Sequence, residues 1–155
     1  MIRITIIGEP VPQGRPRFAR QGNFVTTYDP PKSKVYKELV KRQARAQYKR
    51  EPLTGALSLH LRIYRGVQKN LSKRKREAKL SGQIRPTKKP DTDNYFKGVT
   101  DPLTGILWAD DSMIVEEITE KYYSENPRIE IELKKIGEAD EAIKIVKNEL
   151  KKLDD

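Results

Sequence analysis

The chain has 155 residues, no cysteine, one histidine and a formal net charge of +10. This length suits one domain with a single core, and the lack of cysteine excludes disulfides and thiolate metal sites. Hydrophobic and charged residues each make up 35% of the chain. We therefore expect a modest core under a large charged surface, in a soluble cytoplasmic protein without membrane spans.

The charge is distributed unevenly along the chain. Residues 1–90 carry 23 Lys and Arg against 5 Asp and Glu, whereas residues 91–155 carry 9 against 17. This asymmetry predicts a basic surface for a polyanion and a separate acidic element. A basic surface that serves only solubility is the alternative, because basic patches are common.

The N-terminal part predicts a strand followed by a small hairpin. Residues 2–6 alternate isoleucine with polar residues, which is typical of a strand. A basic loop over residues 14–20 follows. Residues 21–23 form a turn that leads into a short extended segment over residues 24–28.

A helix is predicted over residues 32–50, after the start signal Asp29-Pro30-Pro31. One of its faces is lined at helical spacing by Tyr36, Leu39, Val40, Ala44 and Gln47. The opposite face is basic and can follow a line of phosphates. An ordinary solvated helix face explains such a stripe equally well.

The middle of the chain predicts a half-buried strand over residues 57–63. His60 falls on its polar face, and we interpret it as an ordinary strand residue. Ser72 is suited to cap a short basic helix that ends near residue 80. Residues 66–90 as a whole are expected to form a basic excursion that faces nucleic acid.

The region after Pro90 predicts a helix over residues 91–100 that ends near Asp101-Pro102. Residues 110–112 are expected to form a turn. This stretch holds most of the residues that bear on function.

The last third of the chain predicts strands over residues 113–123 and 129–133. An amphipathic C-terminal helix within residues 137–155 should pack on the core or on a partner. The order of elements indicates an α+β fold. We expect residues 1–155 to form a single two-layer domain, with a mixed or antiparallel sheet and helices packed on it.

Five aspartates and one lysine lie within 21 residues of this otherwise basic chain: Asp91, Asp93, Lys97, Asp101, Asp110 and Asp111. Crowded carboxylates repel one another unless a cation lies among them, and Mg²⁺ is bound by carboxylates together with water and substrate phosphates.

Each of these residues also has an ordinary explanation as a helix cap, a turn residue or an Asp–Lys surface pair. The group as a whole is explained less well in this way, since Asp101 would lie at the unfavourable end of the helix dipole. The pattern therefore favours a metal-dependent nuclease.

Several motifs resemble the RusA family of Holliday junction resolvases over residues 1–135. They are GxPxPxGRPR at 8–17, YDPPKxxxY at 28–36, PDxDNxxK at 90–97, DPLxG at 101–105 and the aspartate pair at 110–111.

This resemblance implies a homodimeric, Mg²⁺-dependent endodeoxyribonuclease of recombination and repair, with Mn²⁺ as a substitute metal. Such an enzyme nicks two opposed strands of a four-way DNA junction. The resemblance implies that Asp91, Asp93 and Asp111 are catalytic metal ligands. It makes Lys97 the essential lysine, with Asp101 and Asp110 as supporting candidates.

Several basic residues are candidates for DNA phosphate contacts: Arg15, Arg17, Arg20, Lys34, Lys41, Lys73, Arg74, Lys88 and Lys89. Phe18 or Phe24 would stack on bases at the branch point or belong to the core. Two alternatives stay open, namely a nuclease for other branched or flapped DNA and a DNA-binding protein without catalysis. We expect a nucleoid-associated protein of bacterial or phage origin.

Overall fold

The computed structural model describes residues 1–153, with side chains placed for residues 1–137 and 145–153. The elements in chain order are β1 (Ile2–Ile7), β2 (Arg17–Gln21), β3 (Phe24–Tyr28), α1 (Pro31–Gln47), β4 (Leu57–Gly66), α2 (Lys73–Leu80), α3 (Thr92–Leu103), the short 3-10 helix η1 (Asp111–Met113), β5 (Ile114–Ser124), β6 (Arg128–Lys135) and α4 (Glu138–Leu153).

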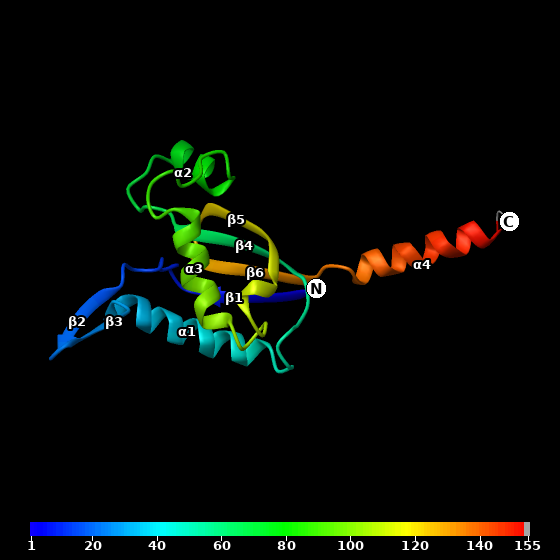
Figure 1. The fold of residues 1–155 in the computed structure, drawn as a ribbon. Helices are drawn as coiled ribbons and strands as arrows, with labels where there is room; N and C mark the ends of the chain where they lie inside the picture. Colours follow the sequence, from blue (N-terminus) through cyan, green and yellow to red (C-terminus); the bar gives the residue numbers. More distant parts are fainter. Residues whose placement is uncertain (154–155) are drawn as a thin grey trace.

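Four strands form a mixed sheet in the order β1-β6-β4-β5. The β1–β6 and β6–β4 pairs are antiparallel, whereas β4 and β5 are parallel. A parallel pair needs a long crossover, and here the crossover contains α2 and α3. Strands β2 and β3 form a separate antiparallel hairpin that projects from the body (Figure 1). The α+β prediction is confirmed, with a mixed sheet.

Helices α1 and α3 cover one face of the sheet, and the core lies between these two layers (Figure 1). The alternation in β4 points every second side chain into this core. The buried apolar residues include Leu57, Leu59, Leu61 and Ile63 of β4, Ile129, Ile131 and Leu133 of β6, Tyr36 and Val40 of α1, Tyr95, Val99 and Leu103 of α3, and Leu107 and Trp108 after it.

The opposite face of the sheet is polar, and its charges are largely paired. Arg62 Nη1 lies 3.1 Å from Glu132 Oε1. His60 contacts the carboxylate of Glu120, which also accepts a hydrogen bond from Tyr122. These bonds hold the pKa of Glu120 below its usual range, with the Tyr122 hydrogen bond as the largest cause. His60 is thus a strand residue on the polar face, as predicted.

Two glutamines of α1 close the outer edge of β1. Gln47 accepts from the Thr5 N–H at 3.0 Å and donates to the Thr5 carbonyl at 2.7 Å. Gln43 makes the same pair of bonds with Ile7, at 2.8 and 3.1 Å. An unpaired strand edge invites association with another chain, so these side chains replace a missing neighbour strand.

Several predicted boundaries differ from the structure, and three of them have a clear physical cause. The basic loop becomes strand β2 from Arg17 onward, because it pairs with β3 across a two-residue turn in which Gly22 has a φ of 61°. Helix α1 ends at Gln47 rather than Arg50, since Tyr48 is extended. Helix α3 continues through Pro102 to Leu103, because Leu103 is fully buried and Thr104 N–H bonds the Thr100 carbonyl at 3.1 Å.

The C-terminal helix α4 is present, but its described apolar side chains do not join the core. Ile145, Val146, Leu150 and Leu153 are all more than half exposed, and α4 extends away from the sheet (Figure 1). The predicted residues Ala142 and Ile143 lie outside the described side chains. Packing of this stripe on the core, one of the two predicted options, is therefore not observed for residues 145–153.

Across residues 1–153, no helix combines the length and the apolar character needed to cross a bilayer.

Candidate active site

Helix α3 presents one polar face toward β5. Asp93, Phe96, Lys97, Thr100 and Asp101 follow one another at helical spacing, so their side chains share one side of the helix. The opposite side carries Tyr95, Val99 and Leu103, which anchor α3 in the core. Amphipathicity thus fixes which side chains reach the space between α3 and β5.

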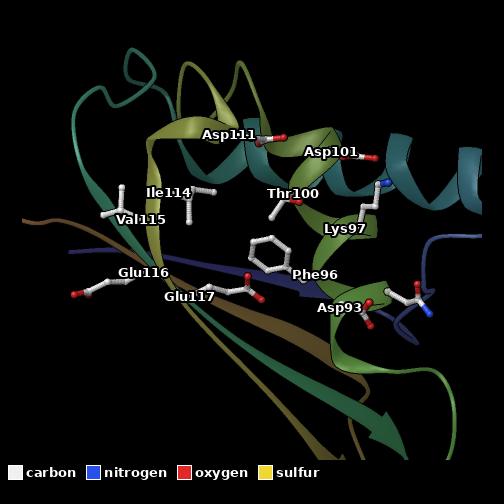
Figure 2. A pocket seen from close by; sticks show the side chains of 11 residues that line it. Asp93, Phe96, Lys97, Thr100, Asp101, Asp111, Ile114, Val115, Glu116 and Glu117 are labelled. Carbon is white, nitrogen blue, oxygen red and sulfur yellow. The ribbon is translucent and has the colours of Figure 1, made fainter.

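A cavity of about 670 Å³ lies between these elements (Figure 2). We call it the α3–β5 cavity. It is lined by Asp93, Asn94, Phe96, Lys97, Thr100 and Asp101 from α3, by Asp111 from η1, and by Ile114, Val115, Glu116 and Glu117 from β5. Two elements that are separated in sequence therefore bring Asp93, Lys97 and Asp111 to one cavity.

The structure fixes Asp111 from the core side. Its Oδ1 accepts a hydrogen bond from Trp108 Nε1 at 2.9 Å and another from the Thr104 hydroxyl. Trp108 is fully buried, so it is a rigid donor. Among the side chains that the structure describes, none donates to Oδ2 of Asp111, which leaves this oxygen available to a ligand.

The neighbouring Asp110 has a different role. Its side chain accepts from the Ser112 N–H at 2.8 Å and caps η1. This backbone hydrogen bond lowers the pKa of Asp110. Asp110 does not line the α3–β5 cavity, and its position matches the turn residue that sequence reasoning offered as its alternative role.

Asp91 occupies the N-cap position of α3, but its side chain makes no capping hydrogen bond. It is exposed and does not line the α3–β5 cavity. In the described part of the chain, no three Asp, Glu or His side chains are grouped closely enough to hold one metal ion. The expected convergence of Asp91, Asp93 and Asp111 on one point is thus not preformed.

The donors in the cavity still suit Mg²⁺ in kind. They are carboxylate oxygens, and Mg²⁺ is commonly bound by one or two carboxylates while water and substrate phosphates complete its shell. Asp93 and Asp111 supply two such groups on separate rigid elements.

Lys97 is exposed on the cavity wall (Figure 2). Among the residues that the structure describes, it forms no ion pair, and the possible Asp93–Lys97 surface pair is not observed. Its ammonium group points toward Asp101 (Figure 2) and, because the side chain is exposed, is accessible to a phosphate.

Asp101 is held by a lysine that sequence reasoning did not single out. Lys37 Nζ lies 2.8 Å from Asp29 Oδ2 and 3.2 Å from Asp101 Oδ2, with its side chain only 15% exposed. The hydrogen bond from Lys37 lowers the pKa of Asp29. Lys37 also offsets the unfavourable position of Asp101 in the last turn of α3. The signal in the sequence was the helical spacing of Lys37 relative to Ser33 and Val40, both of which are buried.

The N-terminal motif packs against both helices. Gln13 N–H donates to the Asn94 carbonyl at 2.9 Å, and Gln13 Nε2 donates to Asp29 Oδ1 at 3.0 Å. A Cβ on Gly98 would lie 3.0 Å from Gln13 N. The glycine of α3 thus lets the loop approach closely, and the loop in turn supports the first turn of the helix.

The predicted DNA-contact residues lie on three elements around α3. Arg15, Arg17 and Arg20 are exposed on and before the β2–β3 hairpin, together with Phe18 at 71% and Phe24 at 78% exposure. The core role considered for these two phenylalanines is therefore wrong. In the view of Figure 1, α3 lies between this hairpin and the excursion over residues 66–90, which contains α2 and which we call the α2 segment.

The remaining predicted contacts are mostly exposed as well. Lys34 on α1 is exposed, while Lys41 is half-buried and its Nζ lies 3.4 Å from Glu38 Oε1. The four predicted contacts of the α2 segment, Lys73, Arg74, Lys88 and Lys89, are all exposed. This segment is tethered to β5, since Lys121 Nζ donates to the Pro90 carbonyl at 3.0 Å.

Comparison with known proteins assigns the chain to a family. The family described as Endodeoxyribonuclease RusA matches residues 8–134. A Bacillus subtilis (strain 168) protein named Uncharacterized protein YqaN is 41% identical over 138 residues, which cover 88% of this chain and 97% of that protein. The family match over residues 8–134 spans the hairpin, α1, α3 and the whole α3–β5 cavity. The chain therefore belongs to the RusA family of endodeoxyribonucleases.

Proposed function

We propose that the protein is a Mg²⁺-dependent nuclease that resolves four-way DNA junctions by paired symmetrical nicks. The observation that carries this proposal is the α3–β5 cavity, which Asp93, Lys97 and Asp111 all line in a chain of the RusA family. The basic residues around the cavity supply the complementary surface for a polyanion.

The proposed metal ligands are Asp93 and Asp111, with Asp91 joining them from the start of α3. A bound Mg²⁺ would lower the pKa of a water molecule and neutralise charge on the scissile phosphate. Mn²⁺ offers the same preference for oxygen ligands and is expected to substitute. The buried Trp108 keeps Asp111 oriented, because it donates to Oδ1 and leaves Oδ2 without a described donor.

Lys97 is proposed to contact the scissile phosphate or the leaving oxygen. An ammonium group placed before the reaction stabilises charge that develops in the transition state. Its freedom from ion pairing among the described residues supports this role, since a paired lysine would first have to break its contact.

The arginines before and within the hairpin, together with the lysines of α1 and the α2 segment, are proposed to bind phosphates of the junction arms. Phosphate contacts position a protein without reading sequence, and they make affinity fall steeply with salt. Phe18 and Phe24 at the hairpin are exposed and can stack on bases at the branch point. Such an enzyme would act at the nucleoid of a bacterial cell.

A homodimer is part of the proposal, because one nick leaves a junction unresolved. A two-fold axis presents two identical active sites to two opposed strands. The expected measurement is a sedimentation mass of twice 17.9 kDa, with or without a junction.

The test uses a synthetic four-way junction with a labelled strand in each arm. Incubation with Mg²⁺ should give symmetrical nicks in two opposed strands, and Asp93→Asn should remove them. Glu125→Gln is the matched control, because Glu125 is an exposed carboxylate that pairs with Arg76 outside the cavity.

Other outcomes identify the alternatives. Preferred cleavage of flaps or single strands would make the enzyme a nuclease for other DNA structures. A gel shift without cleavage, in Mg²⁺ and in Mn²⁺, would leave a DNA-binding protein without catalysis and would overturn the proposal.

A further inference from the structure

The α3–β5 cavity is lined by candidate metal and phosphate ligands, by apolar side chains, and by the carboxylates of Glu116 and Glu117. Asp93, Lys97 and Asp111 account for metal and phosphate. The same cavity is lined by Phe96, Ile114 and Val115, which phosphate chemistry does not use. An apolar wall beside a phosphate site indicates a ligand that carries an apolar surface next to its phosphate.

Phe96 is central to this apolar wall. It lies on α3 three residues after Asp93 and directly before Lys97, and its ring lies between α3 and β5 (Figure 2). One side of Phe96 packs against the core, and it is only partly buried. Across the cavity, Ile114 of β5 points toward Phe96 (Figure 2). Within the described residues, the ring therefore keeps a surface that the chain leaves uncovered.

The size of the cavity suits one nucleotide. Its volume of about 670 Å³ falls within the usual range for small-ligand sites, roughly 300–1,000 Å³. Enzymes that do chemistry on a nucleobase hold it out of its stack against aromatic and apolar side chains, and proteins that bind single strands stack bases on aromatic side chains. Bases beside a branch point have lost a stacking neighbour, so their removal from the helix is less costly.

We propose that Phe96 is a stacking platform for the nucleobase that flanks the scissile phosphate, and that Ile114 encloses the same base from β5. This inference rests on the proposed function, because it places the phosphate at Asp93, Lys97 and Asp111. The ligand is a single unstacked nucleotide of the DNA strand being cut. Stacking tolerates any base, since every base has a flat π-face.

The first test is photo-crosslinking in the Asp93→Asn background, where the DNA stays intact. 5-Iodouracil is placed on either side of the nick that the wild-type protein makes, because this base crosslinks to an aromatic ring on which it stacks. Mass spectrometry should find the crosslink at Phe96, and Phe96→Leu should remove it. Tyr48→Leu is the matched control, since Tyr48 is also a partly buried aromatic packed against the core but lies at the end of α1.

The second test is the rate of junction cleavage. Phe96→Leu should lower kcat/KM by roughly tenfold, the loss expected from one base–aromatic stack. Phe96→Trp should restore most of that rate because it restores the flat surface. Tyr48→Leu should leave cleavage unchanged once its melting temperature shows that it is folded.

The two proposals fail in different ways. If the wild-type protein nicks junctions but 5-iodouracil crosslinks only to other residues or to none, the base platform is wrong and the nuclease assignment stands. If no DNA is cut, a single strand with a central 5-iodouracil still tests Phe96, because it needs no mapped nick. Equal cleavage by Phe96→Leu and the wild-type protein would also overturn the inference.

Discussion

The carboxylate of Asp111 has one oxygen, Oδ1, that is held by hydrogen bonds from Trp108 and Thr104, and a second, Oδ2, that is available to a metal ion. Because Asn keeps the oxygen that accepts from Trp108, Asp111→Asn should preserve the fold, with a change in unfolding free energy within about 1 kcal/mol. Cleavage should fall by at least about 10²-fold, since a metal ligand contributes several kcal/mol to the transition state. Junction cleavage rates and thermal melting measure both effects.

Asp91→Asn should also abolish cleavage, and neither this change nor Asp111→Asn should weaken binding to the junction. Gel shifts with both Asp variants should show junction binding that is intact or tighter, because each change removes negative charge near the DNA backbone. Loss of binding together with loss of cleavage would show that the aspartates are structural.

Lys97 is exposed and unpaired among the described residues, so its loss should affect chemistry more than stability. Lys97→Ala should lower the cleavage rate by about 10²- to 10³-fold, as expected for a preorganised electrostatic donor. The unfolding free energy should change by less than about 0.5 kcal/mol. A large fall in melting temperature with little loss of rate would contradict this role.

Asp29 links stability to pH through Lys37. The pKa of Asp29 in the folded state lies below its ordinary value of 3.8. Its ionised form therefore stabilises the fold above that value, and the contribution disappears as pH falls through the lower folded pKa. The wild-type protein should unfold at higher urea than Asp29→Asn at about pH 5, and the gap should shrink toward about pH 3. A gap that is constant over this range would show that the charge of Asp29 is irrelevant.

At the scale of elements, the contact between the N-terminal loop and α3 depends on Gly98. A Cβ there would lie 3.0 Å from Gln13 N and 3.2 Å from the Val11 carbonyl oxygen, and both are backbone atoms that cannot rotate away. Gly98→Ala should therefore cost about 1–3 kcal/mol of unfolding free energy, against a gain in helix propensity of up to about 1 kcal/mol. Chemical denaturation measures the balance.

Gly66→Ala is the matched control for Gly98→Ala. A Cβ at Gly66 would lie 3.0 Å from Glu9 Oε2, the far end of a flexible side chain that can move. Gly66→Ala should therefore destabilise the protein less than Gly98→Ala. The reverse order would show that loop packing on α3 is not tight.

The hairpin and the α2 segment differ in how firmly they are attached to the rest of the protein. The hairpin has five exposed residues in β3 and makes its regular backbone bonds only within itself. The α2 segment is tethered, because Lys79 is buried with its Nζ 2.8 Å from Gln68 Oε1 and Arg85 bonds the Lys121 carbonyl at 2.9 Å. A basic composition alone does not separate solvent-facing lysines from those that hold a segment in place.

At the scale of the whole molecule, α4 lies beyond the part that matches the family. Its exposed apolar residues do not contribute to the core. A chain shortened to residues 1–137 should therefore unfold within a few degrees of the full chain, roughly the shift that 1 kcal/mol produces. Thermal melting tests this at low protein concentration, and a fall of more than about 10 °C would show that α4 packs on the body.

Sequence periodicity predicted the type of nearly every element. The alternation in β4 and β6 is strong, because one face of each strand is buried and the other is polar. The same reasoning placed the end of α3 too early at Pro102. A proline near the last turn removes one hydrogen bond, and the burial of Leu103 outweighs that local signal.

The sequence by itself determined the class of residues at the site, since spacing along α3 places Asp93 and Lys97 on one face whatever the rest of the chain does. Only the tertiary structure decided that Asp111 joins them while Asp110 caps a turn, that Lys37 bridges Asp29 to Asp101, and that Phe96 faces the same cavity. The physical reason is that helical spacing is a local property, fixed within a few residues. A cavity forms only where elements distant in the chain are packed together by the core.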